Sequence, residues 1–416
     1  MKILRGTLLS AAQPERVTVV PRGYLAAEDD GHIAYVGAEL PQQYAGAPVE
    51  DWGDALILQS FADMHLHAPQ YPMVGLGMDL PLLPWLETYA FPVEAQFADP
   101  AFARACCRQL CAELVENGTT RVCIFSSLHR ESTLILMEEL ERAGICGYAG
   151  KVNMDRRGGK NLEETTEESM RETLRWLDEC QRFRHVKPIL TPRFTPSCTN
   201  ELMAFLGKLA AERELPVQSH LSENAQEIAL VRELHPDCAQ YWETYRKYGL
   251  WRRSVMAHCV HSDARERRAM QEAGVLAVHC PDSNLALCSG TAPVKRMLRE
   301  GVQVALGSDI AGGAILPMPG VMGAAIRASK MRCMMYGDDP LTPAEAYYLA
   351  TSAGHRYFGD APGFAVGNPL HAVVADDSAL FSPARTLTPE ERLERLIDRG
   401  GAAQLRAVYS AGRRIK

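Results

Sequence analysis

Short apolar runs alternate with amphipathic segments through the middle of the chain. Eight runs have the length of buried strands and are bounded by polar or turn-forming residues: 56–63, 120–126, 146–152, 186–191, 217–220, 255–258, 276–279 and 302–309. Most of the intervening segments repeat apolar positions at helical spacing, as at 163–181, 202–213 and 263–273. Strands that alternate with helices are typical of a parallel sheet covered by helices. The pattern therefore predicts an α/β fold.

The number of repeats favours one α/β architecture. Eight strand–helix units are the content of a (β/α)8 TIM barrel, in which parallel strands close into a ring. A doubly wound open sheet is the alternative. Its dinucleotide-binding form carries a Gly-x-Gly-x-x-Gly turn after a strand, and no such turn follows any of the eight runs. We therefore expect the barrel.

The two ends of the chain have a different pattern, with strand-like runs and no helical segments between the first ones. These runs are 17–20, 24–26, 33–37, 371–375 and 407–409. Pro21 and Gly23 separate the first run from the second. Because chain ends often lie close together, we expect both to form one small β-sandwich domain. The predicted domain boundaries are 1–58 and 363–416 for this domain, and 59–362 for the catalytic barrel.

Composition disfavours some classes of binding partner. The 416 residues include 44 Lys and Arg against 51 Asp and Glu, a formal net charge of −7. This balance gives no general attraction to nucleic acid or to an anionic membrane. No apolar run is long enough to span a bilayer, and the first residues lack a signal-peptide core, so we expect a cytoplasmic protein. The 12 cysteines contain no Cys-x-x-Cys pair, which disfavours a zinc ribbon or a dithiol redox site.

Histidines and a carboxylate fall where the strands are predicted to end. His65 and His67 lie two residues apart, which puts both imidazoles on one face of an extended strand. His220 ends the fifth run, His258 ends the sixth, and Asp309 ends the eighth. In a barrel these strand ends converge on the active site, where such a set can hold a zinc ion. For any one of these histidines, a hydrogen-bonded core residue is the alternative.

Glu223 lies three residues past His220. A carboxylate one short turn beyond a metal ligand can reach the reacting water and carry its proton. The alternative is structural, since a carboxylate is also favoured near the start of a helix by the helix dipole. Spacing alone does not separate the two interpretations.

Seven sequence blocks carry a resemblance to a known family. In this chain they lie at 65–72, 75–87, 191–194, 219–224, 257–258, 279–284 and 307–313. Together they resemble the guanine deaminases of the amidohydrolase superfamily, and they occur in family order over roughly residues 55 to 360. The first two blocks and the Thr-Pro-Arg-Phe block look specific to guanine deaminases. One departure is Asp282, which stands where the family usually has Asn.

The resemblance implies a role for each matching residue. One zinc ion per chain would be held by His65, His67, His220 and Asp309. Three residues would act in catalysis, with Glu223 as proton shuttle, His258 positioning the attacking water and Asp309 taking a proton from it. The residues expected to contact the substrate are His67, Ala68, Pro69, Gln70, Arg193, Phe194, His220, Glu223 and Asp309.

Arg193 and Gln70 are expected to face the oxygen and ring edge of a purine. A guanidinium only donates hydrogen bonds, so it suits a keto oxygen and would penalise an amino group in that place. Given the pose that the resemblance implies, this argues for guanine over adenine. The alternative for Arg193 is a purely structural ion pair.

The resemblance implies hydrolysis of guanine to xanthine and ammonia by a homodimer, in purine catabolism or salvage. The nearest alternative is a sister deaminase that acts on another oxo-aminopurine or on a pterin. A cyclic amidohydrolase is less favoured, because binuclear relatives bridge two metals with a carboxylated lysine after the fourth strand, where this chain has Thr191, Pro192 and Arg193. A non-catalytic scaffold is disfavoured because every expected ligand is present. Iron or manganese in place of zinc stays open.

Overall fold

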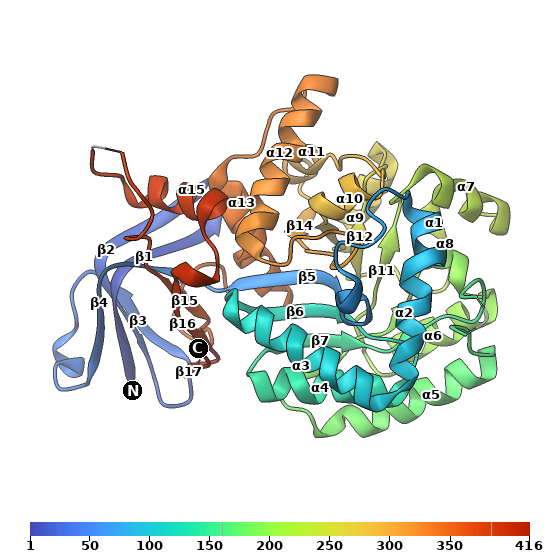
Figure 1. The fold of residues 1–416 in the computed structure, drawn as a ribbon, viewed down its shortest axis with the longest axis horizontal. Coiled ribbons are helices and arrows are strands. Elements are labelled where there is room, and N and C mark those ends of the chain that lie inside the picture. Colours follow the sequence, from blue (N-terminus) through green and yellow to red (C-terminus); the bar gives the residue numbers. More distant parts are fainter. Residues whose placement is uncertain (160, 384) are drawn as a thin grey trace.

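Figure 1 presents the computed structural model of the chain, which describes residues 1–159, 161–383 and 385–416. Strands from both chain ends gather on one side of the molecule, and the strand–helix repeats of the middle of the chain form the other side (Figure 1). The predicted α/β fold is confirmed. Among the described residues, no helix is both long and apolar enough to cross a membrane.

One sheet joins the two ends of the chain. Its strands lie in the order β17-β16-β15-β4-β1-β2-β3. Their bounds are β1 (Lys2–Gln13), β2 (Arg16–Ala27), β3 (Ile33–Gly37), β4 (Val49–Gln59), β15 (Ala372–Ala375), β16 (Leu405–Ser410) and β17 (Arg413–Arg414). β15 pairs with β4, with Val373 opposite Leu58. The described residues form a single sheet here, so the two-layer sandwich stays a prediction.

The sequence pattern missed β1 and divided β2. The expected runs 17–20 and 24–26 are parts of one strand that continues through Pro21. The register between β1 and β2 shifts between Gly6 and Leu8, opposite this proline. A register shift leaves ladder positions unpaired, so a residue without an N–H is tolerated there. Tertiary pairing, and not local propensity, makes this segment a strand.

Parallel strands form the second part of the molecule. Two four-stranded sheets have the orders β5-β6-β7-β9 and β11-β12-β13-β14, and β8 pairs with β10. The bounds are β5 (Phe61–His67), β6 (Thr119–Phe125), β7 (Cys146–Gly150), β8 (Val152–Asn153), β9 (Val186–Pro188), β10 (Thr191–Pro192), β11 (Gln218–Leu221), β12 (Val255–His258), β13 (Leu276–His279) and β14 (Gln303–Leu306).

Most of the helices lie between successive parallel strands. Their bounds are α1 (Leu82–Trp85), η3 (Leu86–Ala90), α2 (Phe91–Ala95), α3 (Pro100–Glu116), α4 (Arg130–Ala143), α5 (Thr166–Glu179), α6 (Asn200–Glu212), α7 (Ala225–Leu234), α8 (Tyr241–Lys247), α9 (Ala264–Ala273), α10 (Pro281–Ala286), α11 (Val294–Arg299), α12 (Met318–Tyr336), α13 (Pro343–Ala350), α14 (Ser352–Tyr357) and α15 (Pro389–Arg399). α12, α13 and α14 follow β14, and α15 lies between β15 and β16. α3 and α4 pack together beside β6 and β7 (Figure 1). The helical region 343–357 is divided at Thr351, between α13 and α14.

Backbone hydrogen bonds join the two parallel sheets at both edges. On one side, the amide of Gln218 donates to the carbonyl of Leu190 at 2.9 Å. On the other side, the amide of Asp309 donates to the carbonyl of His65 at 2.8 Å. The second pair fixes the residue after β14 against β5, and so brings two predicted site residues together.

The first predicted run, 56–63, is not one strand. It contains the end of β4 and the start of β5, which are separated at Ser60. The run is uniformly apolar, and nothing in the alternation of its side chains marks the change of sheet. As a result His65 and His67 lie inside β5, not beyond the first strand.

Candidate active site

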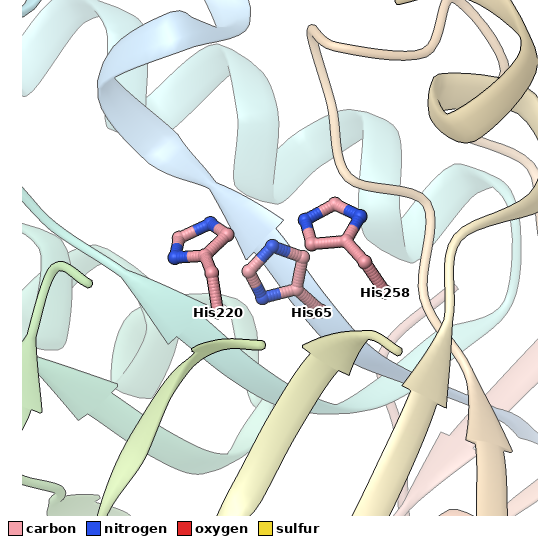
Figure 2. A group of neighbouring side chains, drawn as sticks. All are labelled: His65, His220 and His258. Carbon is pink, nitrogen blue, oxygen red and sulfur yellow. The ribbon is translucent and has the colours of Figure 1, made fainter. Parts of the chain in front are cut away.

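Four histidines come from three parallel strands that end at the same edge. β5 supplies His65 and His67, β11 supplies His220, and β12 supplies His258. In Figure 2 the rings of His65, His220 and His258 face a common space above the strand ends. Asp309 follows β14 by three residues. All five side chains are buried, so the structure brings every predicted metal ligand and His258 into one cluster.

The ligand atoms converge closely. His65 Nε2 lies 3.1 Å and His67 Nε2 3.5 Å from Asp309 Oδ1. The Nε2 atoms of His67 and His220 are 3.1 Å apart. Two overlapping sets have ligand atoms within 4.8 Å of one another: His65, His67 and Asp309, and His65, His220 and His258. This spacing is that of ligands around one divalent cation.

Neighbouring groups orient the rings. His220 Nδ1 donates to the carbonyl of Arg193 at 2.6 Å, and His258 Nδ1 donates to Asn284 Oδ1 at 2.9 Å. A ring nitrogen that donates in this way leaves the lone pair on the other nitrogen. Ser283 Oγ donates to Asp309 Oδ2 at 2.5 Å, which holds the carboxylate in place. The free lone pairs therefore point into the shared space.

The charge states of the cluster fit a cation. Burial, and then the nearby imidazoles, hold the pKa values of His67 and His220 well below the usual range, so both rings are neutral. Burial alone would raise the pKa of Asp309, but His65, His258 and the hydrogen bond from Ser283 together outweigh it and lower that pKa. His65 Nε2 is buried and has no hydrogen-bond partner among the described residues. Three neutral imidazoles and an ionised carboxylate form a donor set suited to zinc.

Glu223 lies beside this cluster. Its Oε2 is 3.4 Å from His258 Nε2, and its Oε1 accepts from Ser289 Oγ at 3.2 Å. Burial, and then the charge of Asp309, raise the pKa of Glu223 to about 8. Its carboxyl therefore holds a proton at neutral pH. The alternative helix-end role belongs to Glu227, which accepts from the amide of Glu223 at 2.9 Å.

A cavity opens over the cluster. Its lining contains eight of the predicted site residues: His67, Gln70, Arg193, Phe194, His220, Glu223, His258 and Asp309. The remaining lining residues are all apolar: Leu82, Trp85, Leu86 and Leu287. The two other predicted contacts, Ala68 and Pro69, are buried in the turn η2 (Ala68–Met73) and do not belong to the lining. Their contact with substrate stays a prediction.

At the polar end of the cavity, Arg193 pairs with a carboxylate that lies behind the lining. Arg193 Nη1 donates to Glu94 Oε2 at 2.6 Å, and Gln70 Nε2 donates to Glu94 Oε1 at 2.8 Å. The guanidinium lies over the ring of Phe91, 5.1 Å from its centroid. Arg193 is thus both a cavity residue and a partner in an ion pair. Its contact with a purine stays a prediction.

Asp282 has a structural position. Its Oδ2 accepts from the amides of Ala314 at 2.8 Å and Ile315 at 3.2 Å. A Cβ on Gly313 would come within 2.9 Å of this carboxylate, so glycine permits the close approach. The carboxylate of Asp282 therefore holds the backbone that follows Asp309.

No lysine occupies the position of a bridging ligand in the part of the chain described. Lys187 in β9 donates to the carbonyl of Phe183 at 3.2 Å. Lys151 is fully buried, follows β7 and pairs with Glu164 at 2.8 Å. Neither residue belongs to the cavity lining.

Sequence reasoning missed several residues that shape the site. They are Glu94, Asn284, Ser283, Ser289 and the four apolar lining residues. One signal was present for Glu94, because this glutamate interrupts the apolar stretch from Phe91 to Phe97. A charged residue in an apolar helical segment needs a buried partner. No spacing rule connects it to Gln70 or to Arg193.

Comparison with known proteins assigns the class. The model of the amidohydrolase family matches residues 56–396, a range that includes every ligand, shuttle and cavity residue described above. The chain belongs to the amidohydrolase family.

Its similarity to individual proteins is more specific. The chain is 34% identical to a guanine deaminase of Dictyostelium discoideum, over 100% of this chain and 98% of that protein. It is 32% identical to human guanine deaminase, over 99% and 96% of the two chains. The crystal structure of guanine deaminase from C. acetobutylicum with bound guanine superposes with a TM-score of 0.96 at 41% identity, covering 100% of both chains. Within the amidohydrolase family, these three relatives are guanine deaminases.

Proposed function

We propose that this protein hydrolyses guanine to xanthine and ammonia. The observation that carries the proposal is one cavity that joins a buried His/Asp cluster to the Gln70–Glu94–Arg193 group. The first group suits a divalent cation, and the second suits the edge of an oxo-purine. Full-length similarity to guanine deaminases supports the same activity.

The metal ligands are His65, His67, His220 and Asp309, and the ion they hold is one zinc per chain. Neutral imidazoles with one carboxylate are the ligands that zinc takes in catalytic sites. Bound zinc supplies a Lewis acid that makes water reactive near neutral pH. The missing lysine after β10 supports one ion and not two.

The cavity residues orient the purine. Arg193 offers only donors, which suit a keto oxygen. Phe194 and the apolar residues Trp85 and Leu86 supply surfaces for the purine ring and keep bulk water out. With its keto edge at Arg193, guanine directs its C2 amine toward the histidine cluster.

Glu223 supplies a proton at the reacting end. Its carboxyl, with a pKa of about 8, is protonated at neutral pH and reaches the space beside His258. The proton goes to ring nitrogen N3, which makes C2 electrophilic. Water adds to C2, Asp309 and Glu223 take up its protons, and one of them passes to the amine. The C2–N bond then breaks, which releases ammonia and leaves the oxo group of xanthine.

The fold proposal follows from the joined sheets. The eight strands β5, β6, β7, β9, β11, β12, β13 and β14 close into a (β/α)8 barrel through the bonds at Leu190 and Asp309. The catalytic barrel comprises 59–362, and the small β domain comprises 1–58 and 363–416. Residues such as Ile57 and Val374 form a second small core on the far face of the terminal sheet, which supports a curled, sandwich-like domain. The homodimer and the cytoplasmic location stay predictions of the sequence.

Ammonia release from purified protein of measured metal content tests the activity. The substrates are guanine, other oxo-aminopurines and a set of pterins. We expect rapid release from guanine, with xanthine as the co-product. If the protein deaminates another compound of this set but not guanine, the proposed reaction would stand and the proposed substrate would be wrong. No release from any member by zinc-loaded protein would overturn the proposal.

A further inference from the structure

Glu94 lies behind the cavity and contacts both residues that are expected to recognise the purine. Its side chain, on α2, is 2% exposed, and Arg193 is 3% exposed. Gln70 comes from η2 and Arg193 from the segment after β10, so three distant parts of the chain meet here. The carboxylate itself is not part of the cavity lining. Glu94 therefore acts on a ligand only through its two partners.

The contacts fix the orientation of the Gln70 amide. A carboxylate paired with a guanidinium only accepts hydrogen bonds, so the group that Gln70 turns to Glu94 is its NH2. The carbonyl of the same amide is then free to face the cavity that Gln70 lines. Gln70 thus presents an acceptor to the ligand.

The same carboxylate fixes Arg193. One guanidinium N–H is used on Glu94, and the plane is held over Phe91. The guanidinium has five donors in a rigid fork, so others remain for a ligand. Gln70 therefore presents a hydrogen-bond acceptor to the ligand, and Arg193 presents donors beside it.

We propose that Glu94 is a positioning residue that sets this hydrogen-bond polarity and thereby selects the substrate. The arrangement accepts a ring N–H beside a keto oxygen, as guanine offers at N1 and C6. It opposes 2,6-diaminopurine, which has a lone pair at N1 and an amine at C6. This inference rests on the proposed function, because it concerns the substrate of the same cavity.

Glu94→Gln tests the polarity directly. The oxygen of the introduced amide stays with the charged Arg193, so the introduced NH2 faces Gln70. The amide of Gln70 then turns its carbonyl to that NH2 and its own NH2 to the cavity, which replaces an acceptor by a donor. We expect KM for guanine to rise at least about tenfold, since an unpaired polar edge is rejected strongly. The inhibition constant of 2,6-diaminopurine should stay unchanged or fall, while metal content and kcat change less.

Two variants serve as controls. Glu94→Asp keeps an acceptor-only carboxylate, so it should preserve the preference for guanine over 2,6-diaminopurine even where efficiency falls. Glu139→Gln changes another buried glutamate that pairs with arginines, Arg104 and Arg142, far from the cavity lining. It should leave both constants unchanged. If Glu94→Gln does not fold, Gln70→Leu removes the acceptor and should weaken guanine more than 2,6-diaminopurine.

The outcomes separate the two proposals. A wild-type protein that does not deaminate guanine overturns the proposed function. A wild-type protein that does, with a folded Glu94→Gln variant whose two constants are unchanged or rise by the same factor, overturns the positioning role alone. A rise in the ratio of KM for guanine to the inhibition constant of 2,6-diaminopurine supports it, because a merely structural role would not distinguish the ligands. A fall in that ratio overturns it.

Discussion

The Nε2 atoms of His67 and His220 face each other across 3.1 Å, although each belongs to a different parallel sheet. Because His220 Nδ1 is the donor to the carbonyl of Arg193, its Nε2 carries a lone pair. Lone pairs of buried, neutral rings at this distance repel unless a proton or a cation lies between them. The geometry of this pair therefore fits either a hydrogen bond donated by His67 Nε2 or a cation that both rings bind.

Removal of one of these ligands should remove the metal. For His220→Ala we expect the zinc content, measured by elemental analysis, to fall from about one per chain to a small fraction. Chelation of the wild-type protein should lower its melting temperature, because an ion present at about 1,000 times its Kd stabilises the folded state by about 4 kcal/mol. A His220→Ala protein that keeps its zinc and its thermal response to chelator would contradict the assigned ligand set.

Loss of the Glu223 carboxyl should stop proton transfer and leave binding intact. For Glu223→Gln we expect kcat to fall by about 10²–10⁴, the usual contribution of a positioned acid or base. KM and metal content should change little, since the side chain keeps its size and its neighbours Ser289 and His258. Steady-state kinetics with guanine measure the effect, with Glu139→Gln as the matched control. Undiminished kcat would exclude Glu223 as the shuttle.

Asn284 should affect catalysis by holding the ring of His258 in its orientation. Its Oδ1 accepts from His258 Nδ1 at 2.9 Å, and this contact turns the other ring nitrogen toward Glu223 and Asp309. For Asn284→Ala we expect kcat to fall about 10–100-fold, the range found for partners that orient a catalytic ring. Asn284→Asp keeps the acceptor and should recover part of that loss. Equal kcat losses in the two variants would indicate a packing effect instead.

The convergence of the candidate ligands could be predicted from the sequence. His65, His67, His220, His258 and Asp309 follow from where apolar runs end, because parallel strands bring those ends to one edge. The end of an apolar run is a local feature that can be read from one sequence. The structure brings all five together.

The residues that were missed depend on contacts between distant segments. Glu94 meets Gln70 and Arg193 only after α2 folds over the cavity, and no periodicity encodes that meeting. The same holds for β2, which continues through Pro21 because β1 pairs with it irregularly. Tertiary contacts override local signals at such positions.

The break between β4 and β5 at Ser60 was hidden for a different reason, because both flanking segments are apolar.

Glu266 provides a stability prediction that does not involve the reaction. This side chain is buried and accepts from Ser222 Oγ at 2.8 Å and from Ser262 Oγ at 2.5 Å. Burial raises the pKa of Glu266 from 4.5 to about 7. Between these two values the folded state therefore binds a proton that the unfolded state has released.

Stability should accordingly fall as pH rises from 4.5 to about 7, because the unfolded state binds fewer protons in this window. A shift of this size corresponds to about 3 kcal/mol in the free energy of unfolding. Glu266→Gln removes the ionising group, so its stability relative to the wild type should increase across the window and level off above about pH 7. Urea denaturation of both proteins at several pH values measures this difference in stability. The contributions of other buried carboxyls, such as Glu227, are present in both proteins and largely cancel. A difference that does not change with pH would show that Glu266 ionises normally in the folded protein.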